Sequence, residues 1–194
     1  IDEMVKARFT AGNMVGDLAM GLFGDFVEVT TTKEDPSTNS GQVLDLAAMI
    51  DKTNECLADG TENIAEASFA WEGNYCAVDI LRKTPDGWAI YEVKSSTGSD
   101  DPKKKKCTRA VLQKYAYDIA YQKFVLEKCG VNVTGVYLVR LNSDYVRGDE
   151  LDLQQLFHIT DMSELVAEES LVIENKVAAA QNVLRMSTAP CLDM

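Results

Sequence analysis

The stretch AVDILRKTPDGWAIYEVKSS, residues 77–96, constrains the fold of this chain more than any other segment. Apolar residues run along both halves, and TPDG at residues 84–87 separates them. Proline presets one backbone angle of a turn and glycine accepts a positive one, so the pattern predicts two antiparallel strands joined by a tight turn. Three ionisable side chains interrupt the apolar pattern, those of Asp79, Glu92 and Lys94.

Helical spacing of apolar residues occurs in four other segments. These are residues 1–23, 41–57, 107–130 and about 161–185. Gly24 and Gly130 are placed to end the first and third helices, and Ser40 is placed to cap the second. The Thr-, Ser-, Asn- and Pro-rich residues 30–41 are predicted to form a loop.

Strand alternation is also present on both sides of the hairpin. It is found at residues 62–73 and 132–142. In the first of these strands, one face is expected to carry Ala65, Ala67, Phe69 and Trp71. The order of helices, three strands, a helix, a strand and a helix predicts an α/β fold with a mixed central sheet flanked by helices. We expect one domain over residues 1–194, with its core at about 60–142 and helical additions at both ends.

The composition narrows the function classes. No window holds the roughly 18 uncharged apolar residues of a membrane span, so no membrane partner is expected and the cytoplasm is the expected location. A net charge of −12 does not suit a surface that binds nucleic acid all over, but it leaves room for a local basic groove near the run Lys103–Lys106. The 5 cysteines are irregularly spaced, which favours reduced thiols over a disulfide framework.

The three charged residues of the hairpin are placed to converge. Glu92 and Lys94 are two apart and share a strand face, and the turn brings Asp79 roughly opposite Glu92. Two carboxylates held together repel each other, and a divalent cation relieves the repulsion. Hard oxygen ligands favour Mg²⁺ or Mn²⁺ over Zn²⁺, particularly in a chain whose only histidine is His158. The alternative is an ordinary charge pair of Glu92 and Lys94, with Asp79 as a cap at the strand end.

With these motifs the sequence resembles the PD-(D/E)xK nuclease superfamily, and more closely its RecB-like and Cas4-like exonuclease branch. The resemblance rests on VDIL at 78–81, YEVKSS at 91–96 and LQKYAYDIAYQ at 112–122. The last segment contains the Q-x-x-x-Y signature of the branch, which falls on Gln113 and Tyr117. The resemblance implies a restriction-endonuclease-like αβββαβ core.

The resemblance also implies roles for individual residues. Asp79, Glu92 and Lys94 would be catalytic in a metal-dependent DNA exonuclease that uses Mg²⁺ or Mn²⁺. The metal would be held by Asp79, Glu92 and the Val93 carbonyl, with Glu66 as a candidate extra acid. Gln113 and Tyr117 would contact DNA or support the site. The Glu66 carboxylate is equally consistent with an exposed strand residue.

Two departures from the family pattern leave an alternative open. The branch usually has a metal-binding histidine in its first helix, in a G-x-x-x-H pattern, but GNMVGDLA at 12–19 places Gly16 there, with Asp17 as a speculative substitute. Many relatives also hold an iron–sulfur cluster. This chain could hold one only if flanking segments beyond the given sequence supplied further cysteines to join Cys191. The alternative is therefore a catalytically impaired PD-(D/E)xK domain that acts as a nucleic-acid-binding or assembly module, with protein partners or further domains.

Overall fold

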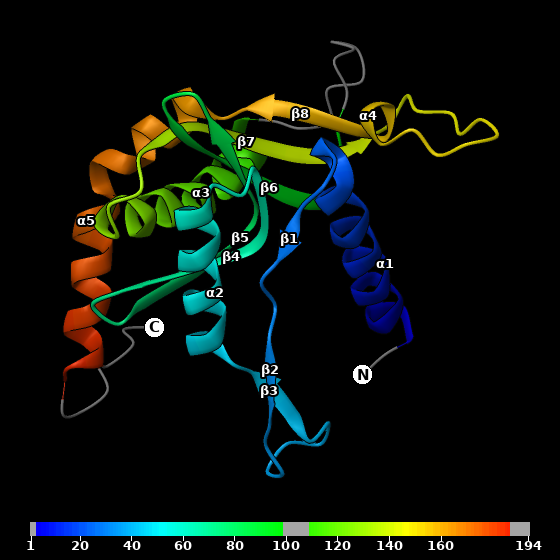
Figure 1. Ribbon diagram of the computed structural model, residues 1–194. Coiled ribbons are helices and arrows are strands. Elements are labelled where there is room, and N and C mark those ends of the chain that lie inside the picture. Colours follow the sequence, from blue (N-terminus) through cyan, green and yellow to red (C-terminus); the bar gives the residue numbers. More distant parts are fainter. Residues whose placement is uncertain (1–2, 99–108, 187–194) are drawn as a thin grey trace.

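The computed structural model describes residues 3–98 and 109–186, with side chains from Gly12 onward (Figure 1). Its elements are α1 (Glu3–Met20), η1 (Gly21–Phe23), β1 (Val27–Glu28), β2 (Thr32–Glu34), β3 (Gln42–Leu44), α2 (Leu46–Asp59), β4 (Asn63–Trp71), β5 (Asn74–Thr84), β6 (Gly87–Gly98), α3 (Arg109–Lys128), β7 (Val133–Asn142), α4 (Leu153–Leu156), β8 (Phe157–Asp161) and α5 (Ser163–Leu184). The expected strands and helices are present as β4, β5, β6, α3, β7 and α5, but the short helix α4 and a further sheet strand, β8, lie between β7 and α5. None of the described helices is long and apolar enough to cross a lipid bilayer.

A six-stranded mixed sheet forms the centre of the molecule, in the order β1-β4-β5-β6-β7-β8. The central strands β4, β5 and β6 pair antiparallel, whereas β6 and β7 pair parallel. A parallel pair requires a crossover connection, and α3 supplies it. The predicted α/β class with a mixed sheet flanked by helices is therefore confirmed.

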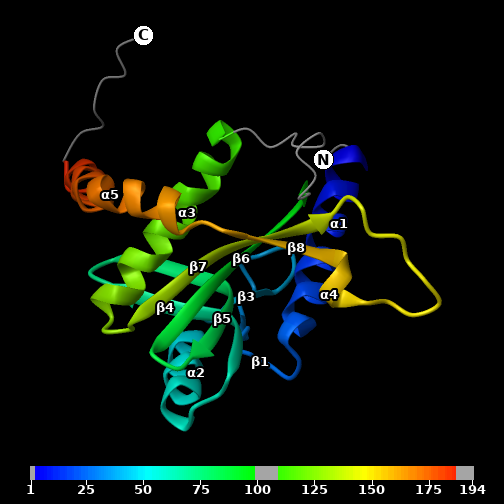
Figure 2. The same cartoon turned by 90° about the horizontal axis from the view of Figure 1, so that it is seen from above.

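The two faces of the sheet carry separate apolar cores. Helices α2, α3 and α5 cover one face, where Met49, Ile119 and Val166 are buried with Leu138 of the sheet. Helix α1 and the short α4 cover the other face, around Ala19 and Val139. Figures 1 and 2 show α1 on the opposite side of the sheet from α3 and α5. A side chain of a central strand therefore points either to α1 or to α3.

The predicted hairpin forms with the predicted turn. Thr84 pairs with Gly87, which leaves Pro85 and Asp86 as the two turn residues. A Cβ atom at residue 87 would overlap the backbone carbonyl oxygen of Asn132, which accepts a hydrogen bond of 2.9 Å from the Trp88 amide. Close backbone approach is therefore an additional reason for glycine at this turn.

The predictions for residues 30–57 were partly wrong. Residues 32–34 and 42–44 pair as a small antiparallel sheet, β2 with β3, instead of forming a loop and the start of a helix. Helix α2 begins only at Leu46, and its cap is Asp45, whose carboxylate accepts from the Ala48 amide, instead of Ser40. The apolar spacing of residues 41–45 fits both a helix and a short strand, so it does not distinguish the two in the sequence.

The predicted face of β4 is also wrong in part. Ile64, and not Ala65, shares the α3-side core with Ala67 and Phe69. The cause is Glu66, which has a left-handed backbone with φ of 58° in the middle of the strand. This conformation reverses the alternation of side chains without adding a residue, because the pairs Ala65–Ile80 and Ala67–Val78 keep one register.

Candidate functional site

The candidate site lies where the pairing of β5 with β6 ends. The last pair of this ladder toward the site is Ile80 with Tyr91, so Asp79 and Glu92 occupy the next position of the register. There the Asp79 carboxylate takes the place of a strand carbonyl, since its Oδ2 accepts a hydrogen bond of 2.6 Å from the Val93 amide. The predicted proximity of Asp79 and Glu92 is thus present in the structure.

Glu92 and Lys94 point to the α3 side of β6. Glu92 is only 4% exposed, and its Oε2 accepts a hydrogen bond of 2.7 Å from the side-chain amide of Gln122. Its Oε1 accepts from Lys94 Nζ, which also lies 3.1 Å from Oδ2 of Asp118. The ring centre of Tyr115 lies 5.9 Å from the same nitrogen. Helix α3 therefore surrounds the ammonium and buries the carboxylate.

Burial and repulsion disturb the ionisation of these groups. Removal from water, together with the negative charges of Glu92 and Glu66, raises the pKa of Asp79 to about 7, against the lowering effect of the Val93 amide and Lys94. Burial also raises the pKa of Glu92, although Lys94 and Gln122 oppose it. For Lys94 burial favours the neutral amine, but Glu92 and Asp118 outweigh it and raise its pKa. Near pH 7, a positive charge placed between the carboxylates would stabilise both in their ionised form.

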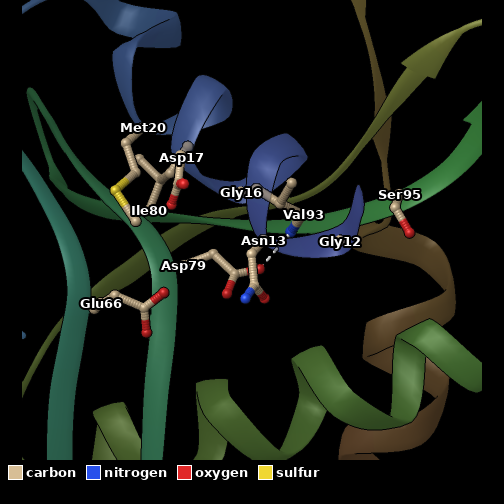
Figure 3. A pocket seen from close by; sticks show the side chains of 10 residues that line it. All are labelled: Gly12, Asn13, Gly16, Asp17, Met20, Glu66, Asp79, Ile80, Val93 and Ser95. Atoms are coloured by element: carbon tan, nitrogen blue, oxygen red, sulfur yellow. Dashed lines mark hydrogen bonds between the residues drawn. The ribbon is translucent and has the colours of Figure 1, made fainter. Parts of the chain in front are cut away.

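A cavity of about 230 Å³ opens beside Asp79 on the α1 side of the sheet (Figure 3). Its lining comes from α1, from β4 and from the hairpin strands. The residues are Gly12, Asn13, Gly16, Asp17, Met20, Glu66, Asp79, Ile80, Val93 and Ser95. The stretch that matches the first-helix motif of the nuclease family, with Gly16 and Asp17, thus borders the same cavity as Asp79.

Glu66 is the third carboxylate of this region. It lies opposite Asp79 in the register of β4 and β5, and its pKa is raised by burial and by Glu28, Glu92 and Asp17. A left-handed backbone costs a residue with a Cβ atom about 1–2 kcal/mol. Such strain collects at functional positions, where the surrounding fold enforces it.

Gln113 and Tyr117 lie against α5 in this structure. The side-chain amide of Gln113 donates to Glu169, and Lys176 Nζ lies 3.9 Å from the ring centre of Tyr117. Within residues 3–98 and 109–186, neither side chain forms a hydrogen bond or an ion pair with Asp79 or Glu92. The two residues are brought together by α3, as their spacing predicts, at the interface with the next helix.

The α3 residues that contact the charged residues of β6 are Asp118 and Gln122, which sequence reasoning missed. They too are four apart and share a helix face. The available signal was this polar pair in a helix that also carries many apolar residues. In the structure Gln122 is buried, and its Oε1 has no hydrogen-bond partner among the described residues. Buried amides are retained where they bond to another polar group, here a carboxylate.

The donor set can be compared with the needs of a divalent cation. Within the described ranges no three His, Cys, Asp or Glu side chains come together as ligands. Asp79, Glu92 and the Val93 carbonyl offer hard oxygens, and Mg²⁺ typically binds one or two carboxylates and keeps several waters. Burial raises the pKa values of both carboxyl groups, and a bound cation would stabilise their ionised forms. The residues therefore fit Mg²⁺ or Mn²⁺ in chemical type.

Other predicted features lie elsewhere. The basic run Lys103–Lys106, Cys107 and Cys191 fall outside the residues that the structure describes. His158 lies on β8, where it borders a second cavity with residues of the β7–α4 connection and of α4, so the structure does not place it with Asp79.

In comparisons with known proteins, no family model matches this chain, and no curated protein matches it in sequence. Fold and geometry therefore define its class: an α/β protein with a six-stranded mixed sheet, helices on both faces and a carboxylate pair at the end of its central ladder.

Proposed function

We propose that this chain is a metal-dependent nuclease with a restriction-endonuclease-like αβββαβ core, of the PD-(D/E)xK type, which hydrolyses phosphodiester bonds in DNA. One observation carries the proposal. Asp79 and Glu92 occupy the position directly after the last β5–β6 pair, and Lys94 reaches the same position from two residues further along β6. Two carboxyl groups with raised pKa values and an ammonium at the end of one ladder suit the binding of a cation and a phosphate.

Each residue has a chemical task in this proposal. Asp79, Glu92 and the Val93 carbonyl would hold Mg²⁺ or Mn²⁺, with Glu66 as an additional acid beside Asp79. When bound, the cation would supply Lewis acidity toward the phosphate and lower the pKa of water. The Lys94 ammonium would stabilise the negative charge that builds on the phosphate oxygens. The attacking water would lose a proton as its oxygen bonds to phosphorus, and the leaving sugar oxygen would take up a proton as its bond to phosphorus breaks.

Gln113 and Tyr117 have a supporting role in the proposal. They connect α3 to α5 through Glu169 and Lys176, and α3 also carries the residues that touch Glu92 and Lys94. By fixing the position of α3 they would fix the Lys94 ammonium. The resemblance of this signature to the RecB-like branch favours an exonuclease and DNA as the partner.

A second candidate is a PD-(D/E)xK domain that has lost catalysis and binds nucleic acid or assembles with other proteins. The favouring observation is that Gly16 borders the cavity where the branch has a histidine, with only Asp17 as a neighbouring acid. The net charge of −12 does not suit extensive contact with nucleic acid, and it favours the loss of catalysis and an assembly role within this candidate.

The proposal is tested by offering the purified chain linear single-stranded DNA, linear duplex DNA, circular DNA and RNA with Mg²⁺ or Mn²⁺. We expect cleavage of linear DNA that chelator abolishes and that Lys94→Met reduces by at least about a hundredfold, because the variant removes the charge and keeps the stem. Lys83→Met, an exposed lysine at the turn end of β5, is the matched control and should keep full activity. Circular dichroism verifies that both variants are folded.

Two results would contradict the proposal in different ways. Full activity in the folded Lys94→Met variant would show that Lys94 and its neighbours are not the active site. Nucleic-acid binding that chelator does not affect, with no cleavage of any substrate, would instead establish the second candidate.

A further inference from the structure

Lys94 is shared between carboxylates of two different elements. Its ammonium contacts Oε1 of Glu92 on its own strand and lies 3.1 Å from Oδ2 of Asp118 on α3. The Glu92 side chain is 5% exposed, and that of Asp118 is 50% exposed. The ammonium therefore lies between a buried carboxylate and one at the protein surface.

The contacts of Glu92 oppose the binding of a cation. Gln122 occupies Oε2 and Lys94 occupies Oε1, so both oxygens already accept a hydrogen bond. The Gln122 amide is neutral, but the Lys94 ammonium repels a divalent cation as well as competing for the same oxygen. For Glu92 to bind a metal, the ammonium has to leave Oε1.

We propose that Asp118 is a positioning residue that retains the Lys94 ammonium when a divalent cation takes Glu92. This inference rests on the proposed metal site at Asp79 and Glu92. Asp118 is already within hydrogen-bond distance, so the ammonium exchanges one carboxylate for another without leaving the site. The Tyr115 ring, 5.9 Å from the same nitrogen, holds the charge on this side as well.

The consequence is a division of roles between the two acids. Glu92 pairs with Lys94 in the metal-free protein and binds the cation in the metal-loaded protein, whereas Asp118 pairs with Lys94 in both states. Without Asp118, Lys94 would have Glu92 as its remaining carboxylate partner within the described structure, and it would compete more strongly with the metal. Asp118 thus sets the metal affinity of a site that it does not touch.

A simple charge effect would also weaken metal binding in Asp118→Asn, because any lost negative charge near the site does so. A double-mutant cycle separates the two causes. In Lys94→Met there is no ammonium to retain, so the proposal predicts that Asp118→Asn then has little effect. A charge effect through space would be the same in both backgrounds.

The experiment is calorimetric titration of chelator-treated protein with Mn²⁺ at low salt. We expect Asp118→Asn to bind Mn²⁺ about two- to fivefold more weakly than wild type, the range for a partly exposed ion pair. Lys94→Met should bind more tightly than wild type, and adding Asp118→Asn to it should change the affinity by less than about 1.5-fold. Asp118→Glu should restore wild-type affinity, and Asp51→Asn, an exposed carboxylate on α2, is the matched control.

The outcomes separate this inference from the proposed function. Equal weakening by Asp118→Asn in both backgrounds, or none in either, overturns the role of Asp118; if Asp79→Asn still abolishes binding, the proposed metal site stands. Failure of folded wild-type protein to bind Mn²⁺ overturns both. Asp118 is half exposed, so its variants should unfold at the wild-type temperature, which thermal denaturation verifies.

Discussion

Replacement of Asp79 by asparagine should make the protein more stable at alkaline pH while it removes the proposed metal site. Asparagine keeps an oxygen that can accept the hydrogen bond of the Val93 amide, and it removes the charge that burial and Glu92 disfavour. A buried carboxylate pair without a neutralising cation destabilises the fold, and substitution of one member should relieve that cost.

The magnitude follows from the pKa of Asp79, which rises from 3.8 to about 7 in the folded chain. Between these values the folded protein holds a proton that the unfolded chain has released. The free energy of unfolding therefore falls as pH rises through this window, by about 1.4 kcal/mol per pH unit. The group is only half deprotonated at pH 7, so the loss approaches about 2.7 kcal/mol from pH 5 to pH 8, and partial solvent exposure of the side chain reduces the expected value to about 2 kcal/mol.

Urea denaturation in the presence of chelator at pH 5, 6, 7 and 8 measures this loss. Wild-type protein should lose about 2 kcal/mol between pH 5 and pH 8, and most of that dependence should be absent in Asp79→Asn. Mn²⁺ added at pH 8 at a hundred times its dissociation constant should return about 2.7 kcal/mol to wild type and nothing to the variant.

A matched control is Asp51→Asn, which removes one exposed carboxylate of α2 and should keep the wild-type pH dependence. The reasoning is refuted if wild type and Asp79→Asn lose stability in parallel between pH 5 and pH 8. It is refuted equally if the variant is less stable than wild type at pH 8, since the carboxylate would then be a net contributor to stability.

Two further predictions concern the backbone around the site. The Glu66→Gly variant should be about 1 kcal/mol more stable than the Glu66→Ala variant, because both remove the carboxylate and only glycine tolerates a φ of 58° without strain. Equal stability of the two variants in urea would show that the backbone is unstrained. Gly87→Ala should destabilise the chain by at least about 2 kcal/mol, because its Cβ overlaps the Asn132 carbonyl oxygen, and a wild-type melting temperature would contradict this.

The hairpin and the faces of its second strand could be predicted because the turn and the alternation agree. Ile90 packs toward α3, and Tyr91 and Val93 pack toward α1, so Glu92 and Lys94 had to share the α3 side. Local sequence and global fold favour the same structure here, and such consistency makes a segment predictable.

The missed features depend on contacts between distant segments. The sequence of β4 contains no glycine that would predict a left-handed residue, and Glu66 adopts this conformation within the folded sheet. Rotation of α3 is likewise set by packing on β6 and α5, so the periodicity of its apolar residues did not tell whether Gln113 or Gln122 would reach Glu92. A helix that is buried on several sides has apolar residues on more than one face, so its sequence does not show which face contacts which neighbour.

The irregularity of β4 is matched in β5, and together they explain how the site can be reached. Val78 and Leu81 lie in the α3-side core while Ile80 lies in the α1-side core, so the alternation of β5 also changes beside Asp79. As a result Asp79 borders the α1-side cavity, whereas Glu92 and Lys94 lie against α3. The two proposed ligands thus meet the end of the β5–β6 ladder from opposite faces of the sheet. Approach of a cation or a phosphate from the α1 side would leave the contact between Lys94 and Asp118 intact, as the positioning role of Asp118 requires.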